Sequence, residues 1–156
     1  MDGGDGGSAK IGAGEGEFAG WRKFTNENFE EAAGPFYWRR GEDGRVRCAF
    51  RAEAKHTNAG GRLHGGSLMT LADMALFAVA WENLEGSRGV TVALESQFID
   101  AGWPGELIEA TGEVTRAGAS LIFARGQVTA GDRLLLTFSG IIKKIRPRTP
   151  PPPSGG

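Results

Sequence analysis

The chain has 156 residues, of which 18 are basic and 19 acidic, and its net charge of −1 argues against a nucleic-acid-binding surface. Its one cysteine, Cys48, excludes an internal disulfide and a cysteine-based zinc site and indicates a reducing compartment. Because the N-terminus has no basic and apolar leader, we expect a cytoplasmic protein.

The two ends of the chain differ in composition from the middle. Residues 1–16 are rich in glycine and contain one large apolar side chain, Ile11, so we expect this segment to lack fixed structure. Residues 147–156 are proline-rich and are expected to form a disordered tail. Residues 17–146 remain, about 130 residues, which is enough for a single domain with one core.

The first part of this domain is predicted to hold a short helix and a hairpin. Apolar side chains recur at roughly helical spacing between residues 18 and 33 and stop before Gly34-Pro35. The sequence Gly41-Glu-Asp-Gly44 then separates two runs that are typical of strands. In the second run apolar residues alternate with arginines, so we expect Cys48 to be a small core residue and the arginines to face water.

A buried helix is predicted next, over residues 67–81. Asp73 is the only ionisable side chain in this stretch, which is otherwise dominated by leucine, methionine, alanine and phenylalanine. A helix that is apolar on nearly all sides must be covered on most of them. The stretch is shorter than the ~20 residues of a membrane span, so we predict the central helix of a water-soluble domain without a membrane anchor.

Four strands are predicted after this helix, at residues 90–98, 107–116, 120–130 and 134–145. Glycine-bearing turns such as Gly118 and Gly131-Asp132 separate the later runs. Strands that follow one buried helix are typical of an α+β protein. We therefore predict a long antiparallel sheet wrapped around one central apolar helix.

The segment just before the helix carries the candidate chemistry. It reads His56-Thr-Asn58-Ala-Gly60-Gly61-Arg-Leu-His64-Gly65-Gly66. Glycines at the start of a helix let a ligand approach the backbone closely, and the free N–H groups there favour an anion or a developing oxyanion. Asp73 lies two turns further along the helix. A satisfied buried acid and a functional carboxylate are both compatible with it.

The pattern Asn58-x-x-Gly61-x-x-His64-Gly65-Gly66, followed by Asp73, resembles the signature of hotdog-fold acyl-CoA thioesterases, most closely the phenylacetate-pathway (PaaI-like) type. The similarity extends from about Phe29 to Lys144. It implies a hotdog fold and hydrolysis of an acyl-CoA to a free acid and CoA, with neither a metal nor another cofactor.

By position, the resemblance assigns a role to each matching residue. Asp73 would be the general base or the nucleophile, and the Gly65 N–H would stabilise the oxyanion. Asn58 would position substrate or water, while His64 would orient Asn58 or the thioester carbonyl. Thr91 would hold the attacking water. The resemblance also implies a homodimer in which Asp73 of one chain faces Gly65 and Asn58 of the other, and a dimer of such dimers.

The remaining candidates concern CoA, whose phosphates need basic partners. The residues assigned to substrate or CoA binding are Gly66, Val90, Val92, Arg116, Gly118, Ser120 and Lys143. Arg116 is the first choice for a phosphate contact, with Lys144 and Arg146 as further candidates, although each could be an ordinary solvated charge.

Other residues near the motif are predicted to have structural roles, and one segment departs from the family pattern. His56 is expected to be a loop residue without a catalytic role. Met74, Phe77 and Trp81 are expected in the core or in the acyl pocket. After the strand ending at Phe98, the family commonly has a basic residue and a proline, where this chain has Asp100-Ala-Gly-Trp103-Pro104.

Two other functions are compatible with the same fold. A hotdog dehydratase or hydratase uses a paired histidine and acid, which His64 and Asp73 could supply, although the Gly-Gly pair after His64 favours hydrolysis. A non-catalytic acyl-CoA-binding module would not need an acid in the buried helix. Absorbance of an enoyl-CoA would identify the first, and tight binding without turnover the second.

Overall fold

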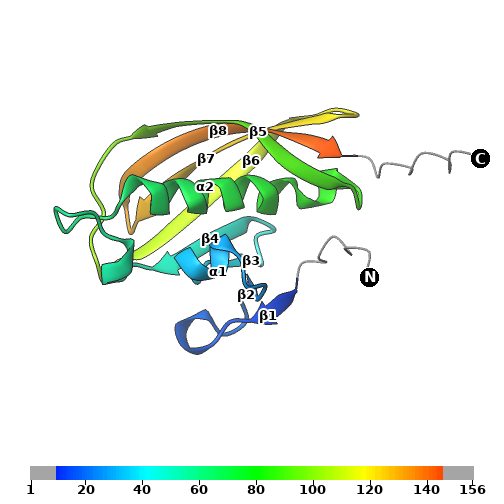
Figure 1. Ribbon diagram of the computed structural model, residues 1–156. Helices are drawn as coiled ribbons and strands as arrows, with labels where there is room; N and C mark the ends of the chain where they lie inside the picture. Colours follow the sequence, from blue (N-terminus) through cyan, green and yellow to red (C-terminus); the bar gives the residue numbers. More distant parts are fainter. Residues whose placement is uncertain (1–9, 146–156) are drawn as a thin grey trace, which may run out of the picture.

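The computed structural model describes residues 10–145. An eight-stranded antiparallel sheet, in the order β1-β2-β3-β4-β6-β7-β8-β5, curls around the helix α2 (Gly65–Ala80) (Figure 1). The other elements in chain order are β1 (Ile11–Ala13), η1 (Gly16–Phe18), β2 (Arg22–Phe24), α1 (Phe29–Ala33), β3 (Tyr37–Arg40), β4 (Val46–Arg51), η2 (Ala54–His56), η3 (Trp81–Leu84), β5 (Arg88–Phe98), β6 (Leu107–Ala117), β7 (Leu121–Ala130) and β8 (Arg133–Ile145). The predicted α+β hotdog architecture is confirmed.

Helix α2 is the centre of the core, as its composition predicted. Leu71, Ala72 and Leu76 have no exposed surface, and they pack against strands β4, β6, β7 and β8. Each fully buried leucine contributes about 1.5–3 kcal/mol to stability. Gly140 of β8 has no side chain at the point where Leu76 packs, which lets the helix lie close to the sheet.

The N-terminal part of the chain differs from the prediction. Ile11–Ala13, within the segment expected to lack fixed structure, form β1 and pair with β2. The helix expected between residues 18 and 33 is also wrong, because only Phe29–Ala33 are helical. Asn28 starts this helix, since its side-chain Oδ1 accepts the Glu31 N–H at 3.1 Å.

Phe18 and Trp21 serve a different purpose from the one that the helical spacing suggested. They form a second small core with Ala49, on the outer face of β4, and the ring of Phe18 stacks on Tyr37 at 4.0 Å. Residues 10–24 therefore extend the sheet through β1 and β2 and cover the outer face of β4 with Phe18 and Trp21. The helical spacing of these apolar residues was misleading, because they are buried by packing against the strand β4 and not by forming one face of a helix.

The hairpin prediction is confirmed, with β3 and β4 joined around Gly41–Gly44. The arginines on β4 face the water side, where Arg47 pairs with Asp43 and Arg51 with Glu17. Cys48 points the other way and is buried in the main core, as expected.

Burial raises the pKa of the Cys48 thiol to about 12, so the thiol is protonated at pH 8. Because the thiolate is the reactive form, we expect Cys48 of the folded protein to resist a maleimide dye at pH 8 and to react fully in guanidinium chloride. Mass spectrometry of the labelled protein with and without denaturant measures this. Rapid labelling of the folded protein would show that Cys48 is accessible.

The four late strands begin and end close to the predicted positions. One side chain differs, since Trp81 at the end of α2 is 63% exposed and does not belong to the core. Met74 is buried and Phe77 packs on the core, as expected. Within residues 10–145, no helix is both long and apolar enough to cross a membrane.

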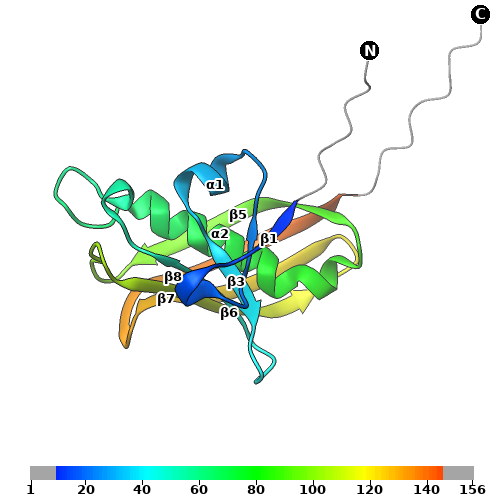
Figure 2. The ribbon, with the colours of Figure 1, turned by 90° about the horizontal axis from the view of Figure 1, so that it is seen from below.

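Two features of the fold position the candidate site. Helix α1 lies beside α2, on the side that the sheet leaves open (Figure 2). Strand β5 is an edge of the sheet, so one side of its 11-residue backbone has no neighbouring strand within the described chain.

Candidate active site

Asp73 and Thr91 lie side by side in the structure, as the resemblance implied. Asp73 projects from the middle of α2 and Thr91 from β5, and the Thr91 hydroxyl donates a hydrogen bond to Asp73 Oδ1 at 2.6 Å. The second carboxylate oxygen, Oδ2, has no recorded partner among the described residues, so it remains available as a proton acceptor.

Asp73 opens onto a pocket of about 230 Å³ between α1 and α2. Its lining residues are Phe29, Glu30, Met69, Thr70, Asp73 and Met74. Phe29 and Glu30 come from α1 and were not predicted as site residues. The sequence held no signal for them, because α1 is only five residues long and its position beside α2 is set by the fold.

The N-terminus of α2 is shaped by His64 and two glycines. His64 caps the helix, since its ring Nδ1 accepts the Gly66 N–H at 2.8 Å. The Gly65 N–H has no hydrogen-bond acceptor within residues 10–145 and is free to bind an oxygen. This free donor at the positive end of a helix is suited to stabilise an oxyanion.

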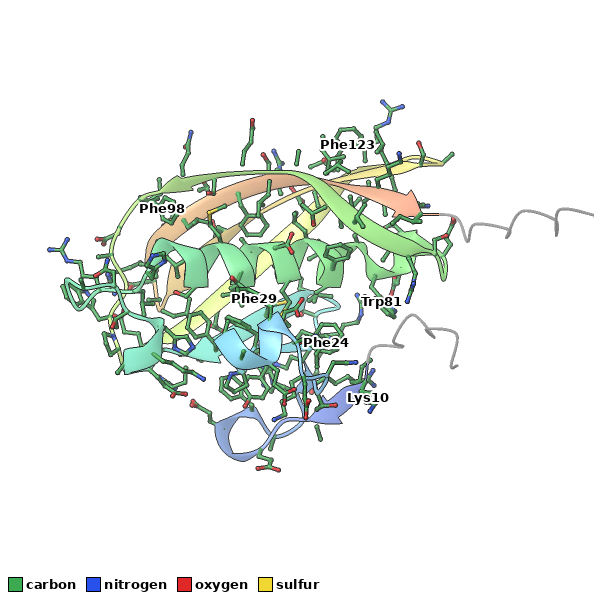
Figure 3. All side chains as sticks on the ribbon, viewed as in Figure 1. Lys10, Phe24, Phe29, Trp81, Phe98 and Phe123 are labelled. Carbon is green, nitrogen blue, oxygen red and sulfur yellow. The ribbon has the colours of Figure 1, made fainter. Side chains whose placement is uncertain are left out.

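Phe98, at the end of β5, packs over Gly65 and would have to move if position 65 carried a side chain. A Cβ at position 65 would lie 2.9 Å from Cζ of the Phe98 ring and 3.0 Å from Cε1, so only glycine fits without a shift. Figure 3 shows Phe98 above the first turn of α2. The ring is 55% exposed and was not predicted as part of the site.

Asn58 lies in the exposed loop before α2, where its side chain shapes the backbone. Its Oδ1 accepts the N–H groups of Gly60 at 2.8 Å and Arg62 at 3.3 Å. The described structure records no hydrogen bond between Asn58 and His64, which instead caps α2. The carboxamide nitrogen of Asn58 has no recorded partner in this part of the chain, so it can still donate to substrate or water.

His56 is buried, and both nitrogens of its ring have hydrogen-bond partners. Its Nδ1 accepts the Glu53 N–H, and its Nε2 lies 2.9 Å from the carbonyl oxygen of Ala33. Its own carbonyl accepts the His64 N–H at 2.8 Å. His56 thus ties the end of α1 to the loop that leads into α2, and so connects the two sides of the site.

The loop after β5 is held by Arg133 of β8, which explains the acid at position 100. Arg133 pairs with Asp100 at 3.4 Å and with Glu106, and it donates a hydrogen bond to the Ala101 carbonyl at 2.9 Å. The Glu106 hydrogen bond raises the pKa of Arg133. Asp100 is therefore part of a structural ion pair.

Trp103 lies in the same loop, close to the segment that carries Asn58. The Arg62 guanidinium lies over the Trp103 ring at 5.4 Å. The two loops also meet through the Leu63 N–H, which donates to the Gly102 carbonyl at 2.9 Å. The loop after β5 thus supports the loop that carries Asn58.

Except for Gly66, which lies in the first turn of α2, the residues predicted to contact CoA lie toward one end of the sheet. Arg116, Gly118 and Ser120 lie at the β6–β7 turn, and Lys143 pairs in register with Val90 on one side and with Leu121 of β7 on the other. Arg116 and Lys143 are both exposed. Lys144 pairs with Glu85 at 3.3 Å, and Arg146 lies outside the described residues.

Gly65 and Asp73 are separated within one chain. They are eight residues apart on the same helix, which corresponds to about 12 Å along its axis. A thioester carbonyl is too small to contact both the Gly65 N–H and the Asp73 carboxylate across that distance.

Val90 and Val92, which were predicted to contact the substrate, lie on the edge strand β5 and leave 42% and 52% of their surface exposed.

Comparison with known proteins identifies the family of this chain. The family described as the thioesterase superfamily matches residues 60–137, which include Gly65, Asp73 and Thr91. The chain is 33% identical over 119 residues to a protein of Pseudomonas aeruginosa named putative esterase PA0474, covering 76% of this chain and 89% of that one. It is 34% identical over 106 residues to acyl-coenzyme A thioesterase 13 of Homo sapiens, covering 65% and 73%.

Solved structures show the same fold. The thioesterase superfamily member 2 of zebra fish has a TM-score of 0.67 and 29% identity, covering 77% of this chain and 88% of that one. The BH2602 protein of Bacillus halodurans, solved with CoA, has a TM-score of 0.67 and 24% identity, covering 71% and 74%. With its fold, its motif and these relatives in agreement, the chain belongs to the thioesterase superfamily.

Proposed function

We propose that this protein is an acyl-CoA thioesterase, which hydrolyses an acyl- or aryl-CoA thioester to a free acid and CoA. The observation that carries the proposal is the Asp73 carboxylate, hydrogen-bonded by Thr91 and open to a largely apolar pocket. Its membership of the thioesterase superfamily and its similarity to a human acyl-coenzyme A thioesterase support this reading.

The chemistry follows from the roles of these groups. Asp73 Oδ2 takes a proton from water as the water oxygen attacks the thioester carbonyl, while Thr91 holds Oδ1 and accepts a hydrogen bond from that water. The negative charge that develops on the carbonyl oxygen is stabilised by the Gly65 N–H. The C–S bond then breaks, and the CoA thiolate leaves and takes up a proton. Direct attack by the Asp73 carboxylate is the alternative route.

Assays with a panel of acyl-CoA substrates test this function. We expect release of free thiol from at least one of a set of aliphatic and aromatic acyl-CoAs, measured with a thiol-reactive chromophore. Tight acyl-CoA binding without turnover would instead support the non-catalytic module. A change in enoyl-CoA absorbance would support a dehydratase or hydratase.

The site is proposed to be shared between two chains of a homodimer. The separation of about 12 Å between Gly65 and Asp73 along α2 requires a second copy to bring the two groups to one carbonyl. The unpaired edge of β5 is a surface on which such a copy can add a strand. Antiparallel pairing would bring the Phe98 end of one β5 close to the Thr91 end of the other. We propose that such dimers pair further into tetramers.

Complementation tests the shared site. Asp73→Asn and Gly65→Ala chains should each be inactive alone, whereas subunits mixed by unfolding and refolding should regain up to about a quarter of wild-type activity, because half the dimers hold one intact site. Light scattering measures the oligomeric state in parallel. Mixed samples that stay inactive, although hybrid dimers form, would place both groups in one chain.

Arg116 and Lys143 are proposed to bind the CoA phosphates. Arg116 and Lys143 lie at the end of the sheet that also holds Thr91, since Lys143 pairs with Val90, the residue next to Thr91. Exposed basic side chains attract a phosphorylated substrate and can position its nucleotide part. Gly118 keeps the β6–β7 turn compact beside Ser120.

A further inference from the structure

Helix α1 supplies two side chains to the pocket beside Asp73 that no catalytic step uses. Building on the thioesterase function proposed above, we propose that Phe29 and Glu30 determine acyl specificity. They make the pocket accept a compact, uncharged acyl group and reject an acyl group that ends in a carboxylate.

The apolar part of the pocket fits the acyl end of the substrate. Phe29, Met69 and Met74 contribute a ring and two thioether side chains, and Phe29 is 68% exposed although it is a large apolar residue. Figure 3 shows Phe29 on the side of α1 nearest α2. The pantetheine arm of CoA carries amides that need polar partners, so an apolar surface here suits the acyl chain.

The pocket has room for a short acyl group. An enclosed apolar cavity of about 150 Å³ holds one benzene molecule, so the open pocket of about 230 Å³ has space for an acyl group of one ring or about six carbons. Phe29 is the exposed apolar residue among those that line the pocket, so removing its ring should enlarge the pocket.

The charge of the pocket is negative. Glu30 and Asp73 both line it, and none of the six lining residues is basic. The Glu30 carboxylate is partly buried and has no recorded partner within residues 10–145. A carboxylate at the end of an acyl chain would therefore meet two like charges in a partly dehydrated space, which disfavours its binding.

Helix α1, which carries Phe29 and Glu30, is held against the domain at its C-terminal end. The Asn28 side chain caps the start of α1 through the Glu31 N–H, and the His56 ring bonds the Ala33 carbonyl at its end. The C-terminal end of this short helix is therefore tied to η2, while the Asn28 cap stabilises its first turn. Side chains on a helix held in this way discriminate better between ligands than side chains on a free segment.

The experiment compares hexanoyl-CoA with adipoyl-CoA, which have the same number of acyl carbons and differ by a terminal carboxylate. For the wild-type protein we expect kcat/KM for hexanoyl-CoA to exceed that for adipoyl-CoA by at least about ten-fold, as like charges in a partly buried pocket require. Glu30→Gln should reduce this ratio several-fold, and Glu30→Lys should reduce it further.

Glu31→Gln is the matched control, because Glu31 is the next residue of α1 but is exposed and does not line the pocket. It should keep the wild-type ratio. Phe29→Ala should raise kcat/KM for decanoyl-CoA relative to hexanoyl-CoA, and circular dichroism checks that each variant is folded.

The outcomes separate the two proposals. If the wild-type protein hydrolyses no acyl-CoA, the thioesterase function itself fails. If it hydrolyses hexanoyl-CoA but the Glu30 variants change the hexanoyl-to-adipoyl ratio no more than Glu31→Gln does, the assigned role of Glu30 is overturned. An unchanged preference for chain length in Phe29→Ala would overturn the assigned role of Phe29.

Discussion

Replacing Asp73 by asparagine is expected to lower kcat by about 10²- to 10⁴-fold, the usual contribution of a positioned general base. Asparagine has nearly the same shape, and its carbonyl oxygen can still accept the hydrogen bond that Thr91 donates to Asp73 Oδ1 at 2.6 Å. The fold should therefore persist while the proton acceptor is lost. Steady-state thiol release measures kcat, and thermal unfolding shows whether stability is kept.

A matched control for this change is Asp132→Asn, in the exposed turn between β7 and β8, which should leave kcat unchanged. Thr91→Val should lower kcat by a smaller factor than Asp73→Asn, because the carboxylate remains but loses its partner, and Thr91→Ser should restore most of the activity. Wild-type rates in Asp73→Asn would remove Asp73 from the mechanism.

The second large effect is expected from Gly65→Ala, which should lower kcat by about 10²- to 10³-fold, comparable to the loss of one oxyanion donor. Alanine keeps the backbone N–H, so the loss has a geometric cause. The new Cβ would lie 2.9 Å from the Phe98 ring, so the exposed ring must turn away from its position over the first turn of α2. The displaced ring then obstructs the approach of the carbonyl oxygen to the Gly65 N–H.

Removing the obstructing ring provides the decisive comparison. The double variant Gly65→Ala/Phe98→Ala should recover much of the kcat that Gly65→Ala loses, when each is compared with Phe98→Ala alone in a double-mutant cycle. Additive losses would mean that the methyl group of alanine interferes with the substrate itself and not with Phe98.

Much of the fold could be predicted from local patterns. The buried helix was recognisable because Asp73 is the only ionisable residue in a stretch rich in leucine, methionine and alanine, and the late strands because glycine-bearing turns separate them. The N-terminal region could not be read in this way. Phe18 and Trp21 have helical spacing, but they pack on the outer face of β4, a contact with a strand that comes later in the chain.

For the candidate site too, part could be predicted from the sequence and part depends on the tertiary structure. The sequence by itself located the candidate groups, because the spacing from Asn58 to Asp73 specifies a helix start with glycines and a carboxylate two turns further on. Only the tertiary structure decided which side chains surround these groups. Thr91 reaches Asp73, Phe98 covers Gly65, and Phe29 lines the pocket because the sheet curls around α2 and brings distant segments together. Such contacts depend on the summed packing of the whole domain, which no local pattern encodes.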